Sequence, residues 1–216
     1  MTEHLIASRS FRTKALAGAG VASLVVLLSA CSQAGPASTS SSAVPTSSAA
    51  VTSQHNGADV EFAQMMIVHH QGAIEMGRLA AQHGASADVR ALGQRIVAAQ
   101  GPEIEQMSGW LTAWGAPSPT TATHAGMPGM EVGGMTQSDA TGDLAGRSGA
   151  EFDRHFLTLM VSHHQGAITM AQTEQSSGSS PAAVALAGAI ITAQTDEIAQ
   201  MHSMLGQLPS PSSELD

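Results

Sequence analysis

Apolar residues recur at helical spacing along four long stretches of the chain. In each stretch an apolar side chain returns every three or four residues, which is typical of a helix that buries one face. No stretch alternates convincingly between apolar and polar residues, as a half-buried strand would. The pattern therefore predicts an all-α protein with helices at about residues 58–83, 87–114, 150–176 and 181–207.

The third and fourth helices repeat the first and second. The phrase "MMIVHHQGAIEM" begins at residue 65, and "LMVSHHQGAITM" begins at residue 159, an offset of 94. Further on, "QGPEIEQM" matches "QTDEIAQM" at the same offset. A constant offset over about 50 residues indicates a duplicated unit, and Gly, Ser and Pro divide each unit into a helical hairpin. Two such hairpins predict a ferritin-like four-helix bundle with pseudo-twofold symmetry.

One position breaks the match between the two units. Pro102 lies inside the second helix, where the second repeat has Asp196. A proline within a helix removes one hydrogen bond and clashes with the preceding turn. We therefore expect a kink or a break near Gln100 and Gly101, and none in the fourth helix.

The N-terminal segment has the outline of a secretory signal peptide. Residues 1–31 begin with basic side chains and continue with an apolar run that ends in Leu-Ser-Ala-Cys. This ending resembles the bacterial lipobox, in which the cysteine is lipidated and becomes the new N-terminus. Because Cys31 is the only cysteine and lies at this position, we expect a lipid anchor there. An ordinary signal peptide that happens to contain a cysteine is the alternative.

Three other segments lack the pattern of a packed core. Residues 32–57 are rich in Ser, Ala and Thr, which predicts a disordered tether, and residues 209–216 form a disordered tail. Between them, residues 58–208 form the folded domain. Within that domain, residues 115–148 are rich in Met and Gly, and a connection of this length is either a linker or a functional loop.

The composition excludes several classes of function. The chain has 8 Lys and Arg against 17 Asp and Glu, a formal net charge of −9 at pH 7, which argues against a nucleic-acid partner. A single cysteine allows neither an internal disulfide nor a cysteine-rich zinc site. No Ser/His/Asp arrangement or phosphate-binding loop is visible in the sequence. The residues left with candidate chemistry are the 10 His and 12 Met.

The predicted interior of the bundle is unusually polar. Asp59 and both histidines of the first repeated phrase fall on the inward stripe of their helix, and the second repeat supplies the same set. Buried polar groups cost several kcal/mol unless they are hydrogen-bonded or bind a ligand. The inward residues that we consider candidate metal ligands are Met66, His69, His70, Met76, Glu103, Met107, Met160, His163, His164, Met170, Glu197 and Met201.

Further candidate ligands lie in the loop. His124, Met127, Met130 and Met135 occur in a Gly/Pro-rich stretch where a core-packing role does not explain them. Thioether and imidazole together suit monovalent copper or silver, whereas imidazole with carboxylate suits divalent copper or zinc. Sites formed mainly by Met should persist in mild acid. Sites formed mainly by His should weaken as the pH falls through the His range near 6.5.

Two other hypotheses fit the same residues. One is a structural or interaction module whose interior His, Asp and Glu only hydrogen-bond to each other. The other is a ferritin-like redox enzyme, but its di-iron site would need a Glu-x-x-His motif on two helices. No such motif falls in the inward stripes, so we expect metal binding without catalysis.

The paired "M-x-x-H-H-Q-G-A-I-x-M" phrases, each followed by "E-I-x-Q-M", resemble the bacterial domain-of-unknown-function family 305 over about residues 58–208. The resemblance implies a ferritin-like four-helix fold and an exported protein, here held by Cys31 on the outer face of the cell membrane or in the periplasm. It also implies copper binding through Met and His, for sequestration or transfer. Leu159 stands where the first repeat has Met65, so Met65 is not counted among the expected ligands. The positions that match the family motif are Met66, His69, His70, Met76, Met160, His163, His164 and Met170.

Overall fold

The computed structural model describes residues 54–120, 127 and 129–209. In these residues the chain forms α2 (Gly57–His83), α3 (Ala87–Trp114), α5 (Gln137–Ala145), α6 (Gly149–Ser177) and α7 (Pro181–Gln207). The four long helices begin and end within one residue of the ranges expected from the sequence. The same residues contain no strand, only an isolated bridge between Val132 and Met135. The predicted all-α class is confirmed.

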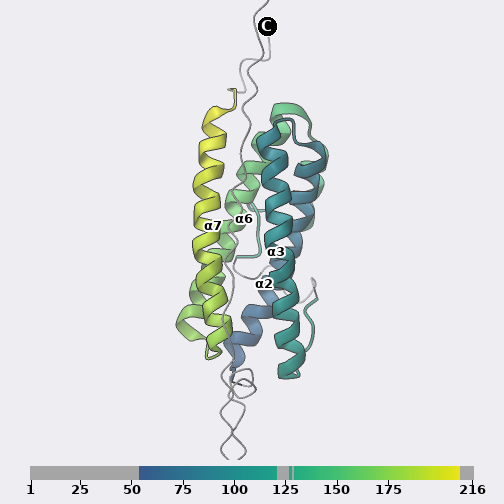
Figure 1. Cartoon of the computed structure of the whole chain (residues 1–216). Helices are drawn as coiled ribbons and strands as arrows, with labels where there is room; N and C mark the ends of the chain where they lie inside the picture. The colour runs from purple at the N-terminus through teal and green to yellow at the C-terminus, as the bar shows by residue number, and fades with distance from the viewer. Residues whose placement is uncertain (1–53, 121–126, 128, 210–216) are drawn as a thin grey trace, which may run out of the picture. The chain divides into compact units, whose positions relative to one another are not determined.

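The long helices form two hairpins that meet along their first helices. α2 packs against α3 and α6 packs against α7, while the contact between the hairpins runs mainly along α2 and α6 (Figure 1). Gly77 and Gly93 allow the backbones of α2 and α3 to come together, because a Cβ on Gly77 would lie 3.1 Å from the Gly93 carbonyl oxygen. The two repeated His-His pairs are therefore brought to the centre of the molecule.

Two buried aspartates join the hairpins reciprocally. Asp59 in α2 accepts hydrogen bonds from the backbone N–H groups of Ser179 and Ser180, just before α7. Asp153 in α6 accepts hydrogen bonds from the N–H groups of residues 85 and 86, just before α3. Both aspartates are buried as expected, but they cap helices of the opposite hairpin instead of pairing with the histidines. The pseudo-twofold symmetry of the repeat is thus built into the junction.

The helix does not break at Pro102, and a kink at this position stays a prediction. α3 continues through Pro102 from Ala87 to Trp114. Pro102 and Ala98, one turn earlier, are both exposed. The carbonyl group that the proline leaves without an N–H partner can therefore be solvated, which limits the cost of the missing helix hydrogen bond.

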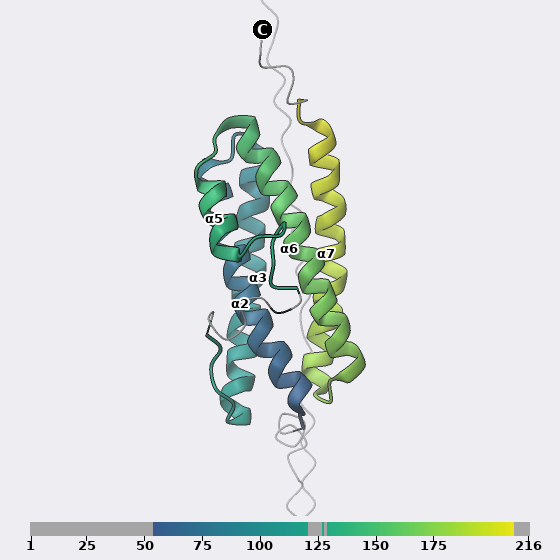
Figure 2. The ribbon, with the colours of Figure 1, turned by 180° about the vertical axis from the view of Figure 1, so that it is seen from behind.

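The connection between the hairpins contains a helix that the sequence pattern does not predict. α5 lies alongside α2 and α6 (Figure 2). The Thr136 side chain caps its first turn by accepting a hydrogen bond from the N–H of Asp139. Only Ala140 and Leu144 of this nine-residue helix are buried. Two buried residues are too few to produce a clear helical period, which explains why α5 could not be predicted.

Some expectations concern residues that lie outside the described ranges. They are the signal peptide and Cys31, the tether up to residue 53, His124 and the tail from residue 210. Among the described helices, α7 is long and apolar enough to cross a membrane by length and composition alone. A core helix of a soluble protein passes the same test, and α7 packs against α6.

Candidate metal centre

His69 and His163 face each other at the contact between α2 and α6. Their ring centroids are 3.6 Å apart, and the ring planes are tilted by 42°. Both side chains are fully buried, and none of their four ring nitrogens forms a well-aligned hydrogen bond, although the backbone of Gly129 lies near the His69 ring and the backbone of His69 lies near the His163 ring. A buried polar group without a partner costs about 1–3 kcal/mol, so this pair destabilises the metal-free fold relative to an apolar pair.

The neighbouring histidines are held differently. His70 Nε2 lies 2.7 Å from Glu103 Oε2, and His164 Nε2 lies 2.6 Å from Glu197 Oε2. In each pair the imidazole donates its Nε2–H to the carboxylate, so Nδ1 is the ring nitrogen left to bind a metal. Both of these Nδ1 atoms are buried and have no hydrogen-bond partner. A carboxylate that fixes the tautomer of a histidine is the usual arrangement behind a metal-binding imidazole.

The electrostatics keep the central pair neutral. Burial, and then the neighbouring histidines, lower the pKa of His69 and of His163 well below the usual histidine range. Both rings are therefore uncharged at neutral pH, and each keeps one nitrogen lone pair. Protons compete with a metal for these two side chains only at a lower pH than the value near 6.5 expected from the sequence.

The connecting segment packs against α6 beside His69. Gly129, with a φ of 86°, packs its backbone against Gly166 in α6. A Cβ on Gly166 would meet the Gly129 carbonyl oxygen and would lie 3.2 Å from His69 Nε2. The contact requires glycine at both positions, so the backbone of the connecting segment forms part of the wall beside His69.

The buried methionines lie in two apolar clusters. In the second repeat, the positions equivalent to Met66, Met107 and Met76 are Met160, Met201 and Met170. Each cluster takes two of these positions from one repeat and the third from the other repeat, together with further methionines of the helices and of the connecting segment. The first methionine cluster contains Met65, Met66, Met107, Met130, Met170 and the partly buried Met127, and the second contains Met76, Met160, Met201, Met204 and the partly buried Met135.

A buried carboxyl pair was missed by the sequence reasoning. Glu174 is 1% exposed and lies beside Asp59. Burial and the Asp59 carboxylate raise the pKa of Glu174 to about 8. Glu174 therefore holds a proton at neutral pH, with its carboxyl group beside the Asp59 carboxylate. Since Ala80 occupies the equivalent position in the first repeat, comparison of the repeats gave no signal for Glu174.

Most of the predicted ligands lie in or beside the core, but they do not form one compact set. All four repeated histidines are fully buried, and the predicted methionines of the helices are buried with them. Glu103 and Glu197 are about one-quarter exposed and contact the histidines. Among the described residues, no group of three or more His, Cys, Asp or Glu side chains converges on one point. A hard divalent ion would therefore lack a complete nitrogen and oxygen ligand set in this core.

The fold and the site define an all-helical protein with a duplicated histidine and methionine core. The chain matches the family described as "Domain of unknown function (DUF305)" over residues 59–205. It is similar to the crystal structure of a DUF305 fragment from Deinococcus radiodurans, with 30% identity over 71% of this chain and 98% of that chain, at a TM-score of 0.62. The chain belongs to the DUF305 family, as its paired motifs suggested.

Two further solved proteins resemble the chain. A DUF305 protein from Streptomyces coelicolor, described as secreted, has 29% identity over 69% of this chain and 93% of that chain, with a TM-score of 0.61. CopM in the Cu(I)-bound form has 30% identity over 69% of this chain and 96% of that chain, with a TM-score of 0.56. CopM structures with Cu(II), with silver and without metal also match. No curated protein matches the chain.

Proposed function

We propose that this chain binds monovalent copper, or silver, in the core between α2 and α6, and that His69 and His163 are its central ligands. The observation that carries the proposal is the set of four unpartnered ring nitrogens on two fully buried, neutral imidazoles. A bound soft cation would satisfy nitrogen lone pairs that no protein group satisfies. The likeness to CopM in its Cu(I)-bound and silver-bound forms supports this choice of metal.

The adjacent pairs extend the proposed site. His70 and His164 would present Nδ1 to the metal, while Glu103 and Glu197 orient them through Nε2 and are not ligands themselves. Neutral imidazole and thioether ligands favour a monovalent, soft ion over a hard divalent one. Two ferritin-like hairpins with the ligands on their facing helices would then enclose the ion.

The structural-module hypothesis has one observation in its favour. The His70–Glu103 and His164–Glu197 hydrogen bonds are what a merely hydrogen-bonded core would contain. That hypothesis does not account for the burial of His69 and His163, because none of their ring nitrogens forms a well-aligned hydrogen bond. For the redox-enzyme hypothesis, Glu103 and Glu197 are each engaged by a histidine and do not supply a di-iron carboxylate set. We propose sequestration or transfer of the metal, without catalysis.

Export and anchoring complete the proposal, with Cys31 as the site of lipidation. Replacing Cys31 with Ala is expected to move the protein from the membrane fraction to the aqueous fraction, because a lipid chain would be its membrane attachment. Fractionation of cells that express either form checks this. Continued sedimentation of Cys31→Ala with membranes, together with incorporation of labelled fatty acid, would show that the anchor lies elsewhere.

Competition for monovalent copper tests the metal assignment. The purified chain is titrated under reducing conditions against a chromophoric Cu(I) chelator of micromolar affinity. The chain is expected to withdraw at least one equivalent of copper from the chelator. If the chelator keeps all the copper, the chain binds copper more weakly than the chelator does. The structural-module hypothesis would then replace the metal-binding proposal.

A further inference from the structure

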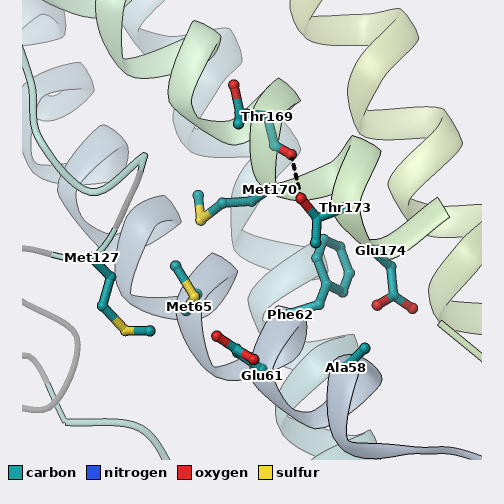
Figure 3. A pocket seen from close by; sticks show the side chains of 9 residues that line it. All are labelled: Ala58, Glu61, Phe62, Met65, Met127, Thr169, Met170, Thr173 and Glu174. Carbon is teal, nitrogen blue, oxygen red and sulfur yellow. Dashed lines mark hydrogen bonds between the residues drawn. The ribbon is translucent and has the colours of Figure 1, made fainter. Parts of the chain in front are cut away.

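A pocket opens between the N-terminal half of α2 and the C-terminal half of α6, with a cavity volume of about 200 Å³. Three methionines line it, each from a different segment: Met65 from α2, Met170 from α6 and Met127 from the connecting segment (Figure 3). The view shows their side chains grouped on one side of the pocket. Met65 and Met170 are 7% exposed, so this region lies at the edge of the core and not inside it.

We infer that this pocket is a second binding site for a soft monovalent cation, with the thioethers of Met65, Met127 and Met170 as ligands. The site is separate from the buried histidines and rests on the proposed function only for the identity of the metal. Three uncharged sulfur atoms suit monovalent copper or silver and give little affinity for hard divalent ions.

The other half of the duplication provides an internal comparison. The positions equivalent to Ala58 and Met65, both of which line the pocket, are Phe152 and Leu159. Phe152 is 1% exposed and Leu159 is 2% exposed, and both belong to a packed apolar cluster. The connecting segment covers Leu159, since a Cβ on Gly133 would lie 3.2 Å from its side chain. One end of the molecule is therefore filled with apolar side chains, while the equivalent end is hollow and lined with sulfur.

The charge at the pocket favours a cation. Glu61 lines the pocket and is exposed, and no Lys, Arg or His is among the lining residues. The negative potential of a carboxylate at the rim of a recess raises the local concentration of cations. The thioethers then supply the selectivity for a soft ion that the carboxylate lacks.

The pocket also adjoins the histidine core. A Cβ on Gly129 would lie 3.2 Å from the side chain of Met170. Gly129 contacts Gly166, whose own Cβ would lie 3.2 Å from His69 Nε2. A single contact between two glycine backbones thus separates Met170 from His69. A cation held in the pocket would therefore lie next to the buried site.

Methyl NMR tests the pocket residue by residue. The full chain is produced with 13C-labelled methionine methyl groups and titrated with silver nitrate, and signals are assigned with single Met→Leu variants. The ε-methyl signals of Met65, Met127 and Met170 are expected to shift together, in one step, as one equivalent of silver binds. Met204, which is buried in the other cluster, serves as the matched control and should not shift in that step.

A second background separates this site from the core. In a His69→Gln, His163→Gln variant the three pocket signals are expected to shift as in the parent chain. In a Met65→Leu, Met127→Leu, Met170→Leu variant, one equivalent of silver is expected to be lost while copper binding at the histidines remains. If the three methyl signals stay fixed while the chain still takes up silver at the histidines, the pocket is not a site, although the proposed function stands. Pocket shifts without any histidine-dependent uptake would support the pocket and contradict the proposed core site.

Discussion

Replacing His69 and His163 together with Leu is expected to weaken monovalent copper binding at least about 100-fold without weakening the metal-free fold. Loss of a metal's oriented imidazoles costs at least the 10–100-fold seen when only their supporting groups are removed. The fold should tolerate the change, because it removes four buried ring nitrogens that form no well-aligned hydrogen bond. Chelator competition measures the affinity, and urea unfolding of the metal-free protein measures the stability.

Two controls make this result specific. His83→Gln with His202→Gln removes two exposed histidines and should leave the core affinity unchanged. In the parent chain, copper held by the central pair should persist from pH 7 through mild acid, because burial lowers the pKa of both side chains well below the usual range. A Leu variant that keeps its copper but loses several kcal/mol of stability would instead assign these histidines a structural role. The His→Gln pair provides a second test if Leu packs poorly.

Replacing Asp59 with Ala is expected to lower the free energy of unfolding by roughly 3 kcal/mol, the largest effect among single substitutions considered for the junction. The change removes the acceptor of the N–H groups of Asn56, Ser179 and Ser180. Each buried N–H group left without an acceptor costs about 1–3 kcal/mol. Asp153→Ala removes two such bonds and should cost less, about 2 kcal/mol. Urea unfolding at pH 7 measures both.

The pH dependence of this effect has a definite sign. Burial by itself would raise the pKa of Asp59, but the neighbouring Glu174 carboxyl group and the backbone N–H groups that donate to Asp59 outweigh burial and lower it. The stabilisation by Asp59 is therefore present above the usual Asp value of 3.8 and is lost as the pH falls through the lowered pKa. Glu61→Ala, an exposed change in the same helix, should alter stability by no more than about 0.5 kcal/mol. Equal stability of Asp59→Ala and the parent at pH 7 would mean that the two hairpins are joined by other contacts.

The helices and the burial of the repeated histidines could be predicted because both are encoded in local periodicity. The apolar stripe of α2 places Met66, His69 and His70 inward, and the structure buries all three. The duplication then predicted the same for α6 from the same phrase. The pairing of His70 with Glu103 also follows from two stripes that face each other across one hairpin.

The features that could not be predicted depend on the contact between the two hairpins or occur in only one repeat. The stripe of α2 placed Asp59 inward, but only the contact between hairpins shows that it caps α7. Met65 is not among the ligands predicted from the repeat, because Leu159 occupies the equivalent position. The structure places the pocket beside Met65, at the point where the two repeats differ. A repeat reveals what its two copies share. Features that occur once, such as Glu174 and α5, leave no trace in that comparison.

The most direct test of the central claim is the position of the metal itself. Crystals of the chain grown with one equivalent of Cu(I) under reducing conditions are measured on both sides of the copper absorption edge. The account predicts an anomalous peak in the core between α2 and α6, within bonding distance of ring nitrogens of His69 or His163. An anomalous peak only on the surface, with the central imidazoles still unligated, would contradict it.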